Sequence, residues 1–170
     1  LGTVEISLLA YSMKNLGNIK YLISALLIIG FGVKASVVPL HVWLPKAHPA
    51  APTPASAVLS GILVKTGIFG IIIVVGVIMN GNIPLSTVII ILGFINMFFG
   101  GFLAMFQRNV KRILAYSSMS QVGYILVGLG LIGLLKDHNA IAVYATLYHI
   151  FNHALFKVLL FLCAGVIYMI

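Results

Sequence analysis

The amino-acid sequence predicts an all-α integral membrane protein with five transmembrane helices, the first of them broken. The 170-residue chain is 62% hydrophobic and only 7% charged, whereas about a quarter of the residues of a soluble domain are charged. It divides into apolar segments of about 20 residues or more, long enough to cross a hydrocarbon core about 30 Å thick. Stretches rich in proline, glycine, asparagine or charge separate these segments.

Five segments have the length of a membrane span. They are predicted at about 20–44, 55–79, 84–106, 111–135 and 140–169. The intervening sequences are "LPKAHPAAPTP", "NGNIP", "QRNVK" and "KDHNA". Thr53 followed by Pro54 is typical of an N-cap and a first helical residue, which predicts the start of the second span. Residues 1–19 are mildly amphipathic and too short to span, so we expect an interfacial connector before the transmembrane region of residues 20–170.

Basic residues at the ends of the spans favour one orientation in the membrane. One side holds Lys14, Lys20 and Lys136, and the other holds Lys46, Arg108, Lys111 and Arg112. The second side is the denser, so the positive-inside rule predicts that loops 45–54 and 107–110 are cytoplasmic, in the cell (plasma or inner) membrane. The net charge of +8 would also suit nucleic acid, but the cations are scattered among membrane-length segments, which argues against that partner.

Three lysines fall inside predicted spans: Lys34, Lys65 and Lys157. Lys65 lies about 17 Å into the second span, and Lys34 lies at a similar depth in the first. An isolated charged lysine at mid-bilayer costs about 2.5–3.5 kcal/mol or more, so each requires a partner, water or loss of its proton. Because desolvation favours the neutral amine, such lysines can exchange protons near neutral pH. We interpret them as ion-translocation residues, the alternatives being snorkelling or static pairing.

The last predicted span contains a column of titratable side chains. His149, His153 and Lys157 recur at i, i+4 and i+8, so they share one helix face. Histidine titrates closest to physiological pH, and water can bridge groups one turn apart into a proton path. The alternatives are histidines bonded to neighbouring helices, or a metal pair. No carboxylate or cysteine accompanies them at suitable spacing, which disfavours a metal site.

Two further features indicate polarity inside the membrane. Ser117, Gln121 and Tyr124 form a stripe at i, i+4 and i+7, which suits helix packing and the lining of water equally. Pro39 lacks an amide hydrogen and clashes with the carbonyl four residues back, so it predicts a break beside Lys34. Irregular backbone is tolerated at membrane depth where it is buried in protein or lines a watery cavity. A plain kink is the alternative, but the adjacent lysine favours an ion path.

Three stretches of the sequence resemble, in order, the antiporter-like subunits of respiratory complex I, Mrp cation/proton antiporters and membrane-bound hydrogenases. They are "GFGVKASVVPLHVWLPKAHPAAPTPASAVLSGILVKTGIFG", "QRNVKRILAYSSMSQVGY" and "HIFNHALFKVLLFLCAGVIY". The resemblance covers nearly the whole chain after about residue 20, and it favours the hydrogenase and formate hydrogenlyase branch. It implies a fold of fourteen helices with two inverted five-helix repeats, of which this chain would correspond to the seventh to the eleventh helices.

The resemblance also implies roles for the titratable residues. Lys34 matches the lysine of the broken seventh helix, and Lys65 matches that of the eighth. The titratable column of the eleventh helix is matched by His149, His153 and Lys157. In the family the first lysine pairs with a glutamate of the fifth helix, and the path leaves through the twelfth. We therefore expect other membrane subunits, or the rest of a longer subunit, to supply a carboxylate near Lys34 and the missing helices.

The predicted function is that of a non-redox subunit, or a fragment of one, that conducts protons or sodium ions in a redox-driven oxidoreductase complex. The chain itself is expected to carry no cofactor, because its single cysteine, Cys163, cannot hold an iron–sulfur cluster. Iron–sulfur clusters, with nickel–iron or flavin centres, are expected in partner subunits. Lipid and the transported ion complete the expected partners. The alternatives are a subunit of an Mrp-type secondary cation/proton antiporter, and a truncated scaffold without its own ion path.

Overall fold

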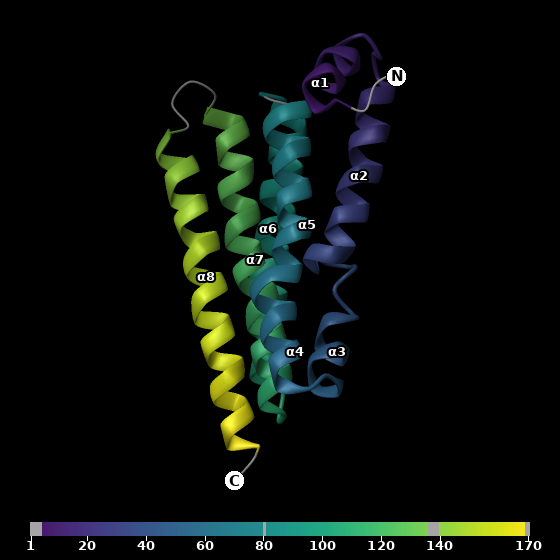
Figure 1. The fold of residues 1–170 in the computed structure, drawn as a ribbon. Helices are drawn as coiled ribbons and strands as arrows, with labels where there is room; N and C mark the ends of the chain where they lie inside the picture. The colour runs from purple at the N-terminus through teal and green to yellow at the C-terminus, as the bar shows by residue number, and fades with distance from the viewer. Residues whose placement is uncertain (1–4, 80, 136–139, 169–170) are drawn as a thin grey trace.

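The computed structural model describes residues 5–79, 81–135 and 140–168, and the regular elements among them are all helical. In chain order they are α1 (Ile6–Lys14), α2 (Ile19–Ala35), α3 (Leu44–Ala50), α4 (Thr53–Val58), η1 (Leu59–Leu63), α5 (Val64–Ile72), η2 (Ile73–Ile78), α6 (Ile83–Met105), α7 (Val110–Leu135) and α8 (Ala140–Ile167). The segments from α4 to η2 form one uninterrupted helix, in which η1 and η2 are π-helical. The long helices run side by side, with α1 at one end of the bundle and α3 at the other (Figure 1).

Four helices of the described residues are long and apolar enough to cross a membrane: Thr53–Ile78, Ile83–Met105, Val110–Leu135 and Ala140–Ile167. They confirm the second to fifth predicted spans to within a few residues. The first predicted span, 20–44, is broken as expected: α2 ends at Ala35 after 17 residues, so the described residues contain four helices of membrane length where five were predicted. Thr53 is the first residue of its helix and Pro52 its N-cap, so the N-cap assigned to Thr53 was wrong by one position.

The chain leaves the helical path at Ser36, three residues before Pro39. Ser36 has a left-handed φ of 58°. The amide of Val37 donates to the carbonyl of Gly32 at 2.9 Å, and the amide of Ser36 donates to that of Val33 at 3.2 Å. These two hydrogen bonds form a Schellman motif, which satisfies carbonyls at a helix end. The predicted break near Pro39 is therefore a capped helix end followed by a non-helical segment, and α3 begins afterwards.

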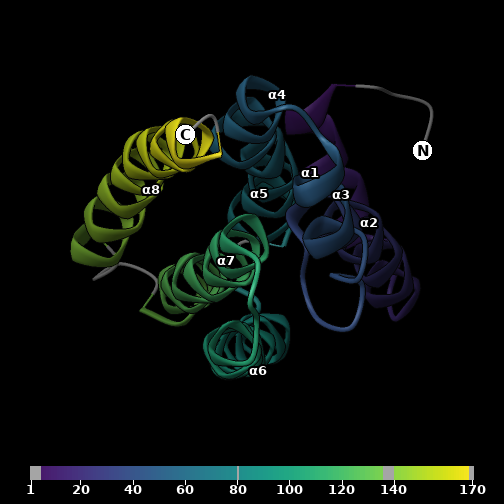
Figure 2. The same cartoon turned by 90° about the horizontal axis from the view of Figure 1, so that it is seen from below.

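α7 occupies the centre of the bundle, in contact with α3, α6 and α8 (Figure 2). Glycines allow α6 to approach it backbone to backbone. A Cβ on Gly93 would lie 2.9 Å from the carbonyl oxygen of Gly123, and a Cβ on Gly123 would lie 2.6 Å from that of Gly93. Small residues permit such close crossings between membrane helices. α8 packs on the other side, against α7, α4 and η1, which brings the predicted titratable column to the interior.

Candidate functional site

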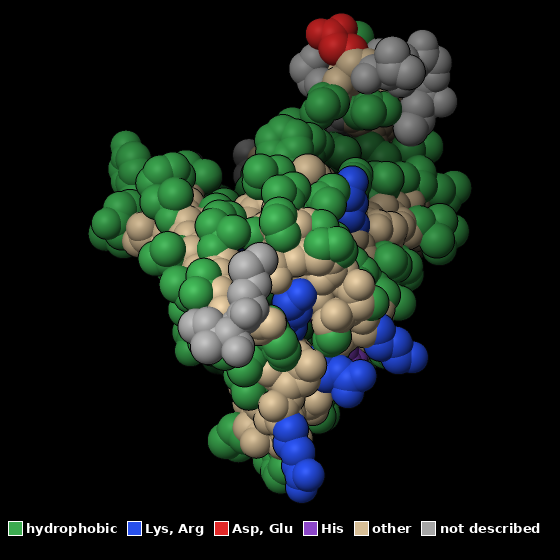
Figure 3. All heavy atoms as spheres, turned by 60° about the horizontal axis from the view of Figure 1, so that its bottom comes forward, with side chains coloured by type: hydrophobic (Ala, Val, Ile, Leu, Met, Phe, Trp, Pro, Cys, Tyr) green, Lys and Arg blue, Asp and Glu red, His purple; other side chains and the backbone are tan. Residues whose placement is uncertain are grey.

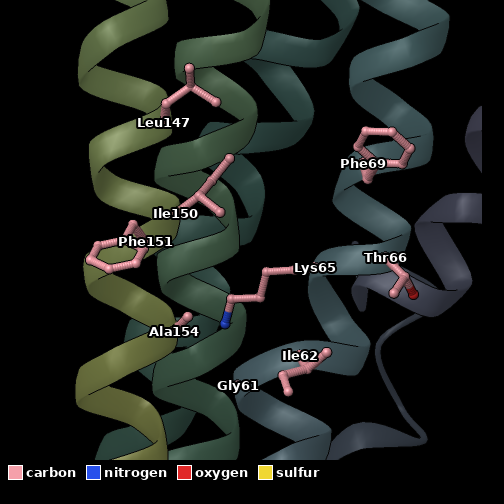
Figure 4. Close-up of a pocket in the computed structure, with 9 residues that line it drawn as sticks. All are labelled: Gly61, Ile62, Lys65, Thr66, Phe69, Leu147, Ile150, Phe151 and Ala154. Atoms are coloured by element: carbon pink, nitrogen blue, oxygen red, sulfur yellow. The ribbon is translucent and has the colours of Figure 1, made fainter.

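Lys65 lies in α5, directly after the π-helical turn η1. Its amine donates a hydrogen bond to the carbonyl of Ser60 at 2.6 Å. The side chain is half-buried and lines a groove of about 410 Å³ between η1, α5 and α8. In Figure 4 its nitrogen points towards α8, close to Ala154, and the aromatic rings of Phe69 and Phe151 lie further along the groove. The groove thus holds one amine among largely apolar side chains, beside a π-turn of the kind often found at functional sites.

Lys157 is held deep in the bundle between α8 and α7. Only 1% of its side chain is exposed. Its amine donates to the carbonyl of Leu114 at 3.0 Å and to the hydroxyl of Ser117 at 2.5 Å. Both acceptors are neutral. The amine also lies 5.8 Å from the centre of the Phe156 ring, and neither hydrogen bond supplies a negative charge to compensate a protonated amine.

A buried serine pair connects the helices that carry the two lysines. The hydroxyl oxygens of Ser60 on η1 and Ser118 on α7 lie 2.9 Å apart. The Ser118 hydroxyl also donates to the carbonyl of Leu114 at 2.8 Å, and this is the same carbonyl that accepts from Lys157. Hydrogen-bonding groups therefore extend from Ser60, whose carbonyl accepts from the Lys65 amine, to Leu114, whose carbonyl accepts from the Lys157 amine.

His149 and His153 lie on the same face of α8 as Lys157, as their spacing predicts. Their rings are parallel, with centroids 6.3 Å apart. His153 is fully buried, and neither of its ring nitrogens has a hydrogen-bond partner within the described structure; the same holds for Nε2 of His149. Lys65 and Lys157 both lie within electrostatic reach of His153. Buried polar atoms are usually paired with protein or ordered water, so these nitrogens mark places for exchangeable partners.

The polar stripe of α7 faces this column. Ser117 accepts from Lys157, and the backbone of Gln121 contacts His149. The ring of Tyr124 lies 5.9 Å from the ring of His149. All three stripe residues therefore meet titratable groups of α8, a relationship that spacing within one helix could suggest but not establish.

Lys34 does not join the column. Its side chain is exposed at the end of α2, and Pro39 is exposed in the following non-helical segment. The backbone of α2 nevertheless packs against α5 here, because a Cβ on Gly67 would lie 2.6 Å from the amide nitrogen of Ala35 and 3.0 Å from the carbonyl carbon of Lys34. The structure thus brings together Lys65 and the three residues of α8, and leaves the side chain of Lys34 on the surface.

Asn96, a fully buried residue of α6, was not predicted from the sequence. Its Oδ1 accepts a hydrogen bond from the amide of Val38 at 2.8 Å, and its Nδ2 donates to the carbonyl of Met119 at 2.9 Å. Asn96 therefore attaches the segment after α2 to α6 and α7. An isolated asparagine in the apolar run "LGFINMFFGG" was the available signal, because uncompensated polar side chains are costly at membrane depth.

His48 of α3 is the second residue that sequence reasoning missed. It is fully buried, neither ring nitrogen has a described hydrogen-bond partner, and its ring stacks on Phe161 with centroids 4.4 Å apart. Burial and then the positive charges of Lys157 and Lys111 lower its pKa to about 4. The imidazole of His48 therefore lies within electrostatic reach of Lys157, the last residue of the column on α8. A histidine inside the proline-rich loop "LPKAHPAAP" was the only sequence signal.

The sequence matches a family model described as NADH:quinone oxidoreductase/Mrp antiporter, transmembrane, over residues 1–169. It is 44% identical over 146 residues to hydrogenase-4 component B of Escherichia coli (strain K12), covering 81% of this chain and 22% of the relative. It is 38% identical over 173 residues to formate hydrogenlyase subunit 3 of the same strain, covering 96% and 28%. NAD(P)H-quinone oxidoreductase chain 4 2 of Thermosynechococcus vestitus is 37% identical over 169 residues, with coverages of 98% and 31%.

Two solved structures share the arrangement of the helices. A chain of the Mrp complex from Dietzia sp. DQ12-45-1b superposes with a TM-score of 0.82 at 31% identity, covering 97% of this chain and 30% of that one. A chain of the archaeal membrane-bound sulfane sulfur reductase gives 0.81 at 34% identity, covering 96% and 28%. The chain spans less than a third of each of these relatives. The helical elements of the described residues, the four membrane-length helices among them and the family match together confirm the resemblance: the chain belongs to the NADH:quinone oxidoreductase/Mrp antiporter family of integral membrane subunits.

Proposed function

We propose that this chain forms part of an ion path, through which protons pass, in the membrane subunit of a redox-driven complex. The supporting observation is the interior grouping of Lys65, His153 and Lys157. Lys157 is buried with neutral acceptors, and neither nitrogen of the adjacent His153 has a hydrogen-bond partner among the described residues. Ionisable side chains are costly inside a membrane and are usually functional there. An arrangement of this kind suits groups that gain and lose protons in turn.

The chemistry of each group suggests how a proton could move. A neutral imidazole holds a proton on one nitrogen and can accept another on the second, so His153 can receive a proton on one side and release it on the other. Bridging waters would supply the unpartnered nitrogens and connect them with the two amines. Because two cations repel strongly in a medium of low dielectric, a proton arriving at Lys65 favours release from the far end of the column. Lys65 would act as the central relay, and His149, His153 and Lys157 as the continuation.

Protons suit this column better than sodium ions. Its described members carry amine and imidazole nitrogens, which exchange protons, whereas hard cations such as sodium are bound mainly by oxygen ligands. The exposed side chain of Lys34 would pair with a carboxylate from another part of the subunit or from a neighbouring subunit, as a switchable charge near the start of the path. Redox centres would reside in partner subunits, as the names of the hydrogenase and quinone oxidoreductase relatives suggest.

An Mrp-type antiporter is the second candidate, favoured by the TM-score of 0.82 to a chain of an Mrp complex. The same column would then operate on ion gradients instead of redox energy. The two candidates separate on purification: co-purifying hydrophilic redox subunits support the first, and their absence from an active complex supports the second.

The test of the ion path is Lys65→Ala in the assembled complex reconstituted into vesicles. Proton movement is followed with a pH-sensitive dye, and redox turnover is measured in parallel. We expect translocation to fall at least tenfold, since the relay loses its proton carrier. The control is Lys20→Ala, a cation beside Tyr21 at the other end of the bundle, which should translocate normally. Normal translocation by a fully assembled Lys65→Ala complex would refute the path and leave the scaffold alternative.

A further inference from the structure

A second polar cavity lies at the end of the bundle where α3 and the segment before it meet the end of α6 and the first turns of α7. Its volume is about 190 Å³, and its polar lining consists of His41, Lys46, Gln107, Arg112 and Tyr116. None of these residues belongs to the proposed ion path. The charged residues among its described lining are both cations, Lys46 and Arg112, and both are exposed. The cavity is therefore suited to an anion.

The surroundings of the cavity reinforce its positive potential. Figure 3 shows Lys and Arg side chains distributed over this end of the molecule, whereas the acidic side chain in view lies at the far end. α7 begins at Val110 beside the cavity, and its N-terminus directs a positive dipole end towards this region. The side chain of Asn109 caps this helix by accepting from the amide of Arg112 at 3.2 Å. The cap fixes the first turn of α7, from which the guanidinium projects.

Four phenylalanines form an aromatic ladder along the outer face of α6. Its members are Phe94, Phe98, Phe102 and Phe106, all of them exposed. The rings of Phe98 and Phe102 lie 5.8 Å apart and those of Phe102 and Phe106 lie 5.0 Å apart. From Phe106 to Phe94 the helix rises about 18 Å, close to half of a hydrocarbon core about 30 Å thick. The ladder thus has the length of one leaflet, and it starts next to Gln107 of the cavity.

We propose that this cavity binds the phosphate headgroup of an anionic phospholipid, with an acyl chain of that lipid along the aromatic ladder. The planar fork of Arg112 matches phosphate oxygens, and Lys46 of α3 adds a point charge to the lining of the cavity. The cavity lies at the end of the spans, where headgroups are found, and basic pockets between helices are suited to anionic lipids at that level. A bound lipid would hold the segment after α2 against the start of α7.

The experiment uses the purified complex, stripped of lipid in detergent and titrated with phosphatidylglycerol, phosphatidylcholine or inorganic phosphate. Native mass spectrometry counts bound lipid, and thermal unfolding reports stabilisation. We expect at least tenfold tighter binding of phosphatidylglycerol than of phosphatidylcholine. The double variant Lys46→Gln/Arg112→Gln should lose this preference, because each cation is expected to strengthen the binding of phosphatidylglycerol about fivefold. The control Arg108→Gln removes an exposed cation at the same end that does not line the cavity, and it should keep the preference.

A second variant separates the two halves of the site. Phe98→Ala/Phe102→Ala should lower the affinity for both lipids by the same factor and leave the ratio of the two affinities unchanged, because it removes contacts with the acyl chain alone. The proposal is overturned if the native complex binds both lipids equally, or if the cation double variant keeps the preference. It is also overturned if Arg108→Gln abolishes the preference, which indicates diffuse attraction, or if inorganic phosphate stabilises the complex as well as phosphatidylglycerol, which indicates a site for soluble anions.

Discussion

The hydroxyl oxygens of Ser60 and Ser118 lie 2.9 Å apart, fully buried between η1 and α7. The carbonyl of Ser60 accepts a hydrogen bond from Lys65. The hydroxyl of Ser118 donates to the carbonyl of Leu114, which also accepts from Lys157. The serine pair therefore sets the relative position of the two helical turns that hold the buried amines. The effects on stability of replacing the two serines should accordingly be coupled.

We predict that Ser118→Ala destabilises the protein by about 1–3 kcal/mol, because it leaves the Ser60 hydroxyl buried without a partner. Ser60→Ala should cost less, since Ser118 keeps its bond to Leu114. In a double-mutant cycle, measured by unfolding in detergent, the double variant should cost less than the two single variants added together, by about 0.5–1.5 kcal/mol.

Ser24→Ala provides the matched control for this cycle. Ser24 is also fully buried, but its hydroxyl has no described hydrogen-bond partner, so its removal should be neutral or stabilising. Additive effects of Ser60→Ala and Ser118→Ala would show that the two hydroxyls do not interact. In that case the link between the two lysine-bearing turns would rest on backbone packing alone.

The long helices could be predicted from the sequence because a membrane span requires a continuous apolar segment of about 20 residues, and such a segment can be recognised locally. The third span, predicted at 84–106, is observed at Ile83–Met105. The break in the first span was predicted near Pro39, but its position could not be read from hydropathy, because apolar residues continue through Val42 and Trp43 although the backbone leaves the helix at Ser36. Hydropathy reports which residues leave water, whereas the end of α2 depends on its Schellman hydrogen bonds and on the remote contact with Asn96.

The candidate site was predictable within one helix and not between helices. The period of the α-helix alone places His149, His153 and Lys157 on one face. Their contacts with α7 depend on which helices become neighbours, and nothing in the spacing along α8 encodes that choice. The position of a lysine along its predicted span likewise could not show whether its side chain lies inside the bundle or on its outer surface. The exposed side chain of Lys34 is the clearest example.

Asn96 is predicted to hold the segment after α2 in place. Asn96→Ala removes the acceptor of the Val38 amide, so we expect a loss of about 1–3 kcal/mol and much faster hydrogen exchange at Val38. The neighbouring Val37 amide donates to Gly32 and should keep its protection, which provides an internal control. The exposed Asn15→Ala should change stability by less than about 0.5 kcal/mol. Unchanged exchange at Val38 in the Asn96→Ala variant would contradict this role.

His48 is predicted to make the stability of the protein depend on acid pH. Its pKa is about 4 in the folded protein, against an ordinary value of 6.5, so between these values the unfolded chain binds more protons at this position. Stability should therefore be complete above about pH 7, fall as the pH drops below about 6.5, and lose on the order of 3 kcal/mol by about pH 4. Lys157 and Lys111 contribute by repelling the imidazolium, in addition to the larger effect of burial.

His48→Phe tests this dependence while keeping the apolar stacking on Phe161. The variant cannot take up a proton at this position, so its stability should fall less steeply than that of the native protein between pH 7 and pH 4. The measurement is the midpoint of thermal unfolding in detergent at several pH values. The difference between the two proteins should be greatest at the acid end, because only there does the unfolded native chain gain a proton that the folded chain excludes. Parallel curves across the whole range would mean that water or a neighbouring group accommodates the charged imidazole, and that burial beside Lys157 and Lys111 does not control its protonation.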